Sequence, residues 1–382
     1  MLDSREDYAT FKAMAPYRGT EAKEALKTLL HARDWEAELA GMIPMTTAKD
    51  LTNEWREVQS VDEFQDRVVK PFMQSLMAKT TEGVTWNGDP NSFHQGMLFL
   101  SNHRDIVLDP SLINVALIEE GRGSTEIGIG SNLLSRPWVN DLVRLNRCFV
   151  VERSGTARER YEHSRKTAAY IQHVTQRGTP VWLAHREGRA KDGTDTTSPA
   201  LMRTLSNNGN CAVWQALNVV PVSISYEWDP CDAMKVNELL HFEKFGTYIK
   251  AQGEDERSMW TGLVGQKGNI HLEFGEILPW QVDAEEVKPE RSMAKKLDEV
   301  LHEGMKTWPN QRLAAEYLGW SRDLFSHLPQ PQSRDTEIWQ SRKDTIEIKL
   351  SKLGWSREQV AHKWCEVLAA PLALRKSLLK ES

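Results

Sequence analysis

The sequence predicts an α/β fold in which helices flank a central sheet, with helical regions added at both ends of the chain. Short apolar segments alternate with helical patterns between residues 84 and 280, and that order builds a sheet covered by helices. Outside this range, apolar residues recur three and four positions apart, as they do on one face of a helix. We therefore expect the 382 residues to divide into a helical region 1–83, an α/β domain 84–280 and a helical region 281–382.

The N-terminal region contains two helical patterns. Residues 21–39 are rich in helix formers, and residues 62–77 repeat an apolar face from Phe64 to Leu76. Pro71 lies inside the second pattern, where a proline removes a backbone hydrogen bond and kinks a helix. Neither segment carries a chemical motif, so packing against the α/β domain is the simplest role for this region.

The central region contains seven segments that are short enough for strands and bounded by glycine, proline or polar residues. The expected strands are 84–88, 97–101, 126–130, 147–152, 180–184, 219–226 and 269–277. Helical patterns lie between them at 110–120, 132–146 and 155–176. Beyond the last strand the chain returns to helix, with candidates at 289–308, 313–318 and, in one or two long pieces, 337–380.

The stretch from Gly96 to Pro110 carries the first candidate site. An apolar strand ends at Asn102-His103, and carboxylates follow at Asp105 and Asp109. Asp109-Pro110 has the residue types of a helix start, with Asp as N-cap and Pro at the first helical position. A neutral imidazole can take a hydroxyl proton near pH 7, because its ordinary pKa is about 6.5, and a carboxylate on the other ring nitrogen fixes its tautomer. The motif suggests that His103 is a general base; an ordinary loop histidine is the alternative.

A second apolar strand ends in an arginine. The segment Cys148–Arg153 is followed by a turn at Ser154-Gly155. A guanidinium at a strand end is a planar, permanently charged fork that suits phosphate or carboxylate. An ion pair within the protein, for example with Glu152, is the alternative for Arg153.

A third strand runs into a cationic loop that contains two glycines. Gly188 and Gly193 allow close approach of the backbone. Three cations gather in the same loop, namely Arg186, Arg189 and Lys191. Glu187 is placed to brace them. The loop indicates a phosphate pocket, and an exposed charged loop is the alternative.

A fourth segment, Val219–Tyr226, is an apolar strand interrupted by Pro221. A proline within a strand predicts an edge or bulge position, which can flank an acyl-chain groove; an ordinary edge strand is the alternative. Ligands of open α/β sheets bind at the carboxyl ends of the strands. A base, an anion fork and a cationic glycine loop at three such ends indicate an acceptor that carries both a hydroxyl and a phosphate.

These four segments, in this order, resemble the glycerolipid acyltransferase superfamily, which includes glycerol-3-phosphate and lysophosphatidate acyltransferases. Asn102-His103 with the downstream Asp resembles the first motif of the family, and Phe149–Arg153 resembles the second. Glu187-Gly188 with Arg189 resembles the third, and Val220-Pro221-Val222 the fourth. The likeness extends over roughly residues 84–280.

Two spacings differ from the family pattern. Five residues separate His103 from Asp109 where the family usually has four, whereas Asp105 follows after only one. We favour Asp109, because its helix-start chemistry matches the place of the family acid, and Asp105 stays an alternative. Gly188 and Arg189 are adjacent where the family usually has one residue between them. Arg189 and Lys191 are therefore both candidates for the phosphate contact.

The resemblance implies a mixed central sheet flanked by helices. It also implies transfer of a fatty acyl group to a hydroxyl of a phosphorylated glycerol or lysophospholipid, in phospholipid biosynthesis. The donor would be a thioester of CoA or of acyl carrier protein, and no other cofactor is expected. His103 would be the base and Asp109 its orienting acid, while Pro221 would lie near the acyl or thioester site. The acceptor phosphate would be held by Arg153, Glu187, Gly188, Arg189 and Lys191.

Composition excludes several classes. The net charge of −6 argues against a general nucleic-acid binder. The four cysteines form no Cys-x-x-Cys pair, so neither a zinc site nor a disulfide framework is indicated, and a cytoplasmic setting is favoured. The sequence contains no run of 18 apolar residues, so no transmembrane helix is expected. If the substrate is a lipid, the protein would meet it at a surface, as a peripheral contact with the inner membrane face.

Two other functions compete with acyl transfer. The irregular spacings are compatible with a non-catalytic protein that binds lipid or acyl thioester on the same fold. A metal-dependent hydrolase would use His103, Asp105 and Asp109 as ligands, although no second cluster such as His-Glu-x-x-His supports it.

Overall fold

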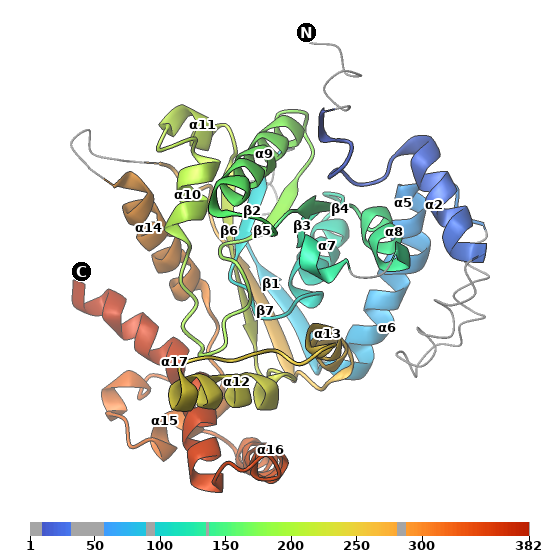
Figure 1. Ribbon diagram of the computed structural model, residues 1–382. Helices are drawn as coiled ribbons and strands as arrows, with labels where there is room; N and C mark the ends of the chain where they lie inside the picture. Colours follow the sequence, from blue (N-terminus) through green and yellow to red (C-terminus); the bar gives the residue numbers. More distant parts are fainter. Residues whose placement is uncertain (1–9, 32–56, 89–95, 135–136, 281–287, 382) are drawn as a thin grey trace.

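The computed structural model describes residues 10–31, 57–88, 96–134, 137–280 and 288–381 (Figure 1). Its centre is a seven-stranded sheet with the order β1-β7-β6-β2-β5-β3-β4. All neighbouring pairs are parallel except β6 and β7, which confirms the expected mixed sheet. The strands are β1 Gly83–Asn87, β2 Leu98–Ser101, β3 Glu126–Gly130, β4 Cys148–Val151, β5 Val181–Ala184, β6 Val219–Tyr226 and β7 Asn269–Phe274.

Helices cover both faces of the sheet because alternate strand residues point to opposite sides. Leu98 and Leu100 of β2 enter a core that contains residues of α9, α10 and α14 (Pro289–Gly304). Phe99 enters a second core with α6 (Lys70–Thr80) and α7. Figure 1 shows these two helical layers on either side of the strands. The helices of the central region are α7 Leu108–Glu119, α8 Pro137–Leu145, α9 Ala157–Thr175, α10 Pro199–Leu205, α11 Cys211–Gln215, α12 Asp232–Phe245 and α13 Glu254–Val264.

The N-terminal region is helical where the structure describes it. Its elements are α2 Gly19–His31, α5 Val61–Phe64, a π-helical turn Gln65–Val69 and α6 Lys70–Thr80. The helix expected over 21–39 is described as far as His31, and the rest of that segment lies outside the described residues. The π turn ends two residues before Pro71, which has no N–H to donate to the carbonyl of Arg67.

The C-terminal region forms α14 Pro289–Gly304, α15 Pro309–Tyr317, α16 Ser333–Ser351 and α17 Arg357–Glu381. Helix α14 packs on the sheet beside β6, but α15, α16 and α17 share a separate hydrophobic core with α12. Tryptophans 228, 339 and 364 meet in that core. The helical addition is therefore tied to the central region through α12, and the three-part division of the chain stays a prediction.

Pro221 does not lie at a sheet edge, so that expectation is wrong. Strand β6 lies between β2 and β7 in the interior of the sheet. The Pro221 carbonyl accepts a hydrogen bond from the N–H of Gly275, just beyond the last residue of β7. The N–H that proline lacks would face the same side, where the β6–β7 ladder has already ended. A proline is tolerated here because it costs at most one bond at the end of the ladder, while its carbonyl still accepts from Gly275.

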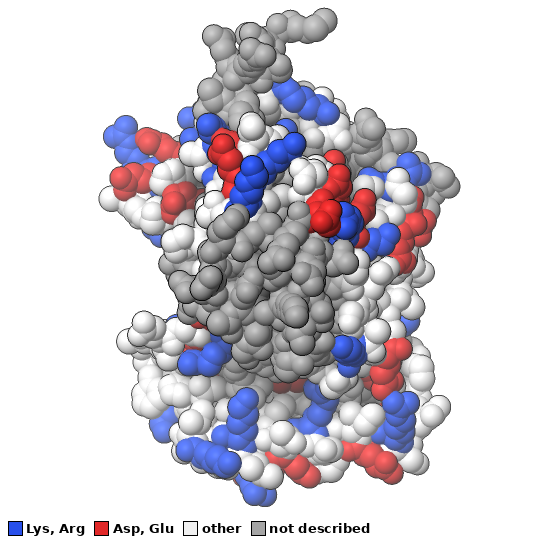
Figure 2. All heavy atoms as spheres, turned by 90° about the vertical axis from the view of Figure 1, so that its right-hand side faces the viewer, with Lys and Arg blue, Asp and Glu red and all other residues white. Residues whose placement is uncertain are grey.

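Two surface properties bear on function. None of the helices in the described parts of the chain has the length and apolar character needed to span a bilayer. On the face drawn in Figure 2, the described cationic and acidic side chains are interspersed rather than separated by sign. Among the described side chains of that face, Figure 2 shows no basic patch of the kind typical of nucleic-acid binders.

Candidate active site

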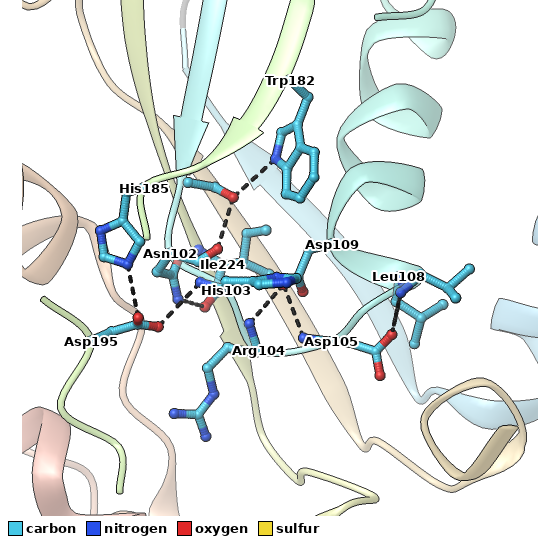
Figure 3. Close-up of polar contacts among 12 residues, drawn as sticks. Asn102, His103, Arg104, Asp105, Leu108, Asp109, Trp182, His185, Asp195 and Ile224 are labelled. Carbon is cyan, nitrogen blue, oxygen red and sulfur yellow. Dashed lines mark hydrogen bonds and ion pairs between the residues drawn. The ribbon is translucent and has the colours of Figure 1, made fainter. Parts of the chain in front are cut away.

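His103 lies just beyond the end of β2, and Asp109 of helix α7 holds its ring (Figure 3). The His103 Nδ1 atom is 2.9 Å from Oδ2 of Asp109. Asp109 is fully buried, whereas the His103 side chain remains 13% exposed. No described residue hydrogen bonds to Nε2 of His103, so this nitrogen is available to a substrate hydroxyl.

The start of α7 differs from the sequence prediction. Helix α7 begins at Leu108, so Asp109 and Pro110 lie inside its first turn rather than at the N-cap and first helical position. Asp105 satisfies the helix start instead, because its Oδ1 accepts hydrogen bonds from the N–H groups of Val107 and Leu108, both at 2.9 Å. Asp105 therefore faces the helix and does not contact the His103 ring. Burial and the neighbouring charge of Asp109 raise the pKa of the Asp105 carboxyl.

Asp109 accepts hydrogen bonds on both oxygens. The N–H groups of Arg104 and Asp105 donate to Oδ2 at 2.7 and 2.9 Å, beside the His103 ring. The hydroxyl of Tyr226, at the end of β6, donates to Oδ1 at 2.8 Å. Burial and the charge of Asp109 raise the pKa of Tyr226 well above its ordinary value, so the hydroxyl stays protonated and keeps donating.

The backbone that carries His103 is fixed on two sides. The side chain of Asn102 exchanges two hydrogen bonds with the backbone of Ile224, at 2.7 and 2.9 Å, and so extends the pairing of β2 with β6. The N–H of His103 donates to Oδ2 of Asp195 at 3.2 Å, and Oδ1 of Asp195 lies 2.8 Å from Nε2 of His185. Figure 3 shows this chain of contacts beneath the His103 loop.

Asp195 and His185 are buried. Burial alone would raise the pKa of Asp195, but the hydrogen bond from His185 and the charge of Arg104 bring it below its ordinary value. The sequence prediction missed Asp195, His185 as a buried partner, and Tyr226. The one available signal was His185 at the end of an apolar strand, where an unpartnered imidazole would be costly.

A cavity of about 430 Å³ opens beside His103 at the carboxyl ends of the parallel strands. Much of its wall is apolar and comes from β3, β4, β5 and the helix that follows β3. Its apolar lining includes Ile127, Ile129, Val143, Val151, Trp182 and Leu183. The cavity therefore combines a candidate base with an apolar wall large enough for part of an acyl chain.

Four cations of the predicted phosphate site line this cavity, namely Arg153, Arg186, Arg189 and Lys191. Arg189 donates to the hydroxyl of Ser258 at 2.6 Å, and Lys191 forms an ion pair with Glu238. Arg153 Nη1 is 3.7 Å from the exposed carboxylate of Glu187. Arg186 is half-buried and has no hydrogen bond or ion pair with any described residue, so it is the cation most available to an anion.

Of the other predicted binding residues, Gly188 lines the cavity, whereas Glu187 and Pro221 do not. Gly188 lines the cavity with a positive φ of 71°, a backbone conformation that favours glycine. Glu187 does not line the cavity, and its side chain is 76% exposed beside Arg153. Pro221 is buried within β6, in register with Leu100, and is also absent from the cavity wall.

Glu152 does not pair with Arg153. Its Oε1 instead accepts hydrogen bonds from the Ser131 hydroxyl and from the N–H groups of Arg153 and Ser154. The Ser131 hydroxyl, followed by these backbone donors, lowers the pKa of Glu152 to about 2. The guanidinium of Arg153 therefore remains on the wall of the cavity, without an ion pair to Glu152. It lies against Gly130, where an added Cβ would come within 2.8 Å of Arg153 Nε.

The three residues that the metal-hydrolase hypothesis names, His103, Asp105 and Asp109, do not form a metal-ligand set in the described structure. In the described ranges, no group of three His, Cys, Asp or Glu side chains is arranged to hold a metal ion. His103 and Asp109 bind each other, while Asp105 is turned toward the start of α7.

Comparison with known proteins places this site in a family. Residues 83–225 match the family model described as Acyltransferase, a range that contains His103, Asp109 and the cationic loop. This match identifies residues 83–225 as an acyltransferase domain. The resemblance drawn from the four sequence motifs is thereby confirmed.

The chain was also compared with solved structures and with curated proteins. The chain is similar to the crystal structure of the 1-acyl-sn-glycerophosphate (LPA) acyltransferase, PlsC, from Thermotoga maritima. The similarity has a TM-score of 0.37 at 14% sequence identity and covers 73% of this chain and 96% of that chain. A comparison with curated proteins gave no significant match.

Proposed function

We propose that this acyltransferase moves a fatty acyl group from an acyl thioester to a free hydroxyl of a phosphorylated glycerol or lysophospholipid. The observation that carries this proposal is the position of His103. Its Nε2 has no partner among the described residues, and its ring lines a cavity whose wall is partly apolar and partly cationic. A substrate with an acyl chain, a hydroxyl and a phosphate matches all three properties.

The chemistry follows from these groups. Nε2 of His103 takes the hydroxyl proton while the acceptor oxygen attacks the thioester carbonyl carbon. The tetrahedral intermediate collapses by breaking the carbon–sulfur bond, and the imidazolium returns the proton to the departing thiolate. The products are an ester and a free thiol. Asp109 steadies the imidazolium and fixes the ring so that Nδ1 carries the proton in the resting state.

The cationic side of the cavity would hold the acceptor phosphate. Arg186 has no competing partner among the described residues, and Arg153 has only a 3.7 Å contact with an exposed carboxylate. Arg189 is already oriented by Ser258. Guanidinium groups form bidentate, charge-assisted hydrogen bonds with phosphate. Lys191 is engaged by Glu238 and contributes charge at a longer range.

The apolar side of the cavity would take the acyl chain. Ile127 and Ile129 of β3 and Leu183 of β5 face it together with the ring of Trp182. Burying an acyl chain there is favourable by roughly 0.8 kcal/mol for each methylene removed from water. The thioester carbonyl would then meet His103, whose ring lies 5.9 Å from that of Trp182 between their centroids.

A thioester assay tests the proposal. The purified protein is given a long-chain acyl-CoA or acyl carrier protein together with glycerol 3-phosphate, lysophosphatidate or no acceptor, and thiol release is followed. We expect release that depends on a phosphorylated acceptor and yields its acyl ester. Tight binding of acyl thioester without turnover, for both donors and all acceptors, would favour the non-catalytic binding protein instead.

A further inference from the structure

Exposed apolar side chains gather at the end of helix α12 and in the loop that follows it. Phe242, Phe245 and Ile249 are 59%, 60% and 86% exposed. Leu353, in the turn between α16 and α17, is 61% exposed. These four residues, which we call the apolar tip, are the most exposed large apolar residues in the described part of the chain. Such a concentration marks an interaction surface rather than scattered surface residues.

Ring contacts hold the two parts of the tip together. The ring of His241 lies 5.7 Å from that of Phe245 and 5.0 Å from that of Trp355, measured between centroids. Lys244 Nζ lies over the same two rings, at 5.3 and 5.2 Å. The α12 end and the α16–α17 turn, with Leu353 two residues before Trp355, are therefore neighbours. Aromatic rings interleaved with a lysine are typical of surfaces that meet the lipid–water interface.

The tip is continuous with the wall of the active-site cavity. Lys250 lines the cavity, and the residue before it is Ile249, the most exposed apolar residue of the tip. Glu238 of α12 and Met259 of α13 line the same cavity. The segment from α12 to α13 thus contributes to the wall of the cavity and carries three of the four tip residues, Phe242, Phe245 and Ile249.

The nearby carboxylates are engaged within the protein. Glu243 pairs with Lys363, and Asp255 is 2.6 Å from Lys250 Nζ. Glu254 accepts from the Tyr248 hydroxyl at 2.9 Å and from the N–H of Ala251. Because Lys250 is itself paired, contact with a partner would depend on the apolar side chains more than on charge.

We propose that the apolar tip inserts into the surface of a lipid bilayer beside the cavity mouth. The inference rests on the proposed function, in which the acceptor or product is a lipid that must pass between bilayer and cavity. A second copy of the chain fits less well, because four partly exposed side chains cover less than the roughly 800 Å² per partner of a typical stable interface. Docked in this way, the enzyme would exchange lipid with the bilayer through the rim at Lys250.

Vesicle binding tests this directly. Flotation with phosphatidylcholine vesicles, with and without phosphatidylglycerol, compares the full chain with the triple variant Phe242→Ser/Phe245→Ser/Ile249→Ser. A matched control, Tyr161→Ser/Ile277→Ser, removes exposed apolar residues outside the tip. We expect the wild type and the control to bind both vesicle types even at high salt. The triple variant should bind at least about tenfold more weakly, because each inserted large side chain contributes more than a factor of ten when fully buried.

Activity separates this inference from the proposed function. With short-chain, water-soluble substrates the triple variant should turn over like the wild type, and with vesicle-embedded lysophosphatidate it should lose about tenfold. Unchanged vesicle binding by a folded triple variant would overturn the inference, as would a lipid-free dimer of the wild type that the same substitutions dissociate. Absence of turnover by the wild type with every substrate would overturn the proposed function, while the vesicle result would still stand.

Discussion

The Tyr226 hydroxyl donates a 2.8 Å hydrogen bond to Oδ1 of Asp109, while Oδ2 of the same carboxylate receives the His103 ring. Tyr226 ends β6, and Asp109 lies in the first turn of α7. The bond therefore ties the helix that carries the acid to a strand beside the one that carries the base. With Arg104 and Asp105 donating from the backbone, the carboxylate cannot rotate without breaking several hydrogen bonds.

Removing that hydroxyl should impair catalysis more than binding. In Tyr226→Phe, Oδ1 of Asp109 loses its donor, and a hydrogen bond to a charged group contributes about 1.5–3 kcal/mol. We expect kcat to fall about tenfold or more while KM changes little, since Tyr226 does not line the cavity. Steady-state kinetics on a variant shown to be folded will measure both constants, and an unchanged kcat would mean that Asp109 needs no help from Tyr226.

Asp105 and Asp109 should respond differently to the same amide substitution. Asp109→Asn places an amide among donors that need an acceptor and removes the charge beside the imidazolium, so we expect activity to fall about a thousandfold or more. Asp105→Asn keeps an oxygen that can cap α7, so activity should stay close to that of the wild type. Comparable losses in the two variants would contradict the assignment of Asp109 as the partner of His103.

Asp105 should instead matter for stability. In Asp105→Ala the N–H groups of Val107 and Leu108 lose their acceptor. We expect the free energy of unfolding to decrease by about 1 kcal/mol, because an intramolecular hydrogen bond typically contributes about that much. Urea denaturation of Asp105→Ala beside Asp105→Asn measures this, and equal midpoints for the two would argue against a capping role.

The cavity arginines should control affinity for a phosphorylated acceptor. Truncating Arg186 to alanine removes the half-buried cation that has no partner in the described structure, and a charge-assisted hydrogen bond contributes about 1.5–3 kcal/mol. We expect KM for the acceptor to rise about 10- to 100-fold in Arg186→Ala, with a smaller change in kcat. Arg158→Ala is the control, because Arg158 is exposed on α9 and pairs with Glu162. A similar KM in both variants would remove Arg186 from the phosphate site.

Asp232 of α12, which contacts Trp364 of α17, should make the free energy of unfolding depend on pH. Its Oδ2 accepts from the indole N–H of Trp364, and its Oδ1 has no hydrogen-bond partner among the described residues. Burial together with the charge of Asp229 raises the pKa of Asp232 to about 7. The unfolded carboxyl ionises near 3.8, so between these values the folded state holds the proton more tightly. Asp232 therefore makes stability decline as pH rises from about 4 to 7. Asp232→Asn should flatten that part of the stability curve in urea titrations, and an unaltered slope would contradict the raised pKa.

The positions of the strands and the His103–Asp109 pair could be predicted because both depend on local sequence. Each strand is a short apolar segment with clear boundaries, and the acid follows the histidine six residues later. Tyr226 and Asp195 could not be found in this way, because they lie 117 and 92 residues from the groups that they hold. Their roles arise from β6 pairing with β2 and from the loop after β5 folding back under His103.

Two predictions failed for physical reasons that composition does not reveal. Pro221 has the residue type of an edge strand, yet its missing N–H faces a place where β7 has already ended. Asp109-Pro110 has the residue types of a helix start, yet Asp105 captures the first free N–H groups and the helix begins earlier, at Leu108. In both cases the deciding contact lies on another segment or several residues upstream.

The central claim is that His103 is the base of an acyl transfer. The most direct test measures acceptor-dependent thiol release by the wild type, by His103→Ala and by Asp105→Asn, each confirmed as folded by its urea transition. We predict that the rate of His103→Ala falls by about 10²- to 10⁴-fold, the typical contribution of proton transfer by a positioned side chain, while Asp105→Asn stays active. A folded His103→Ala enzyme that transfers acyl groups at the wild-type rate would contradict the account.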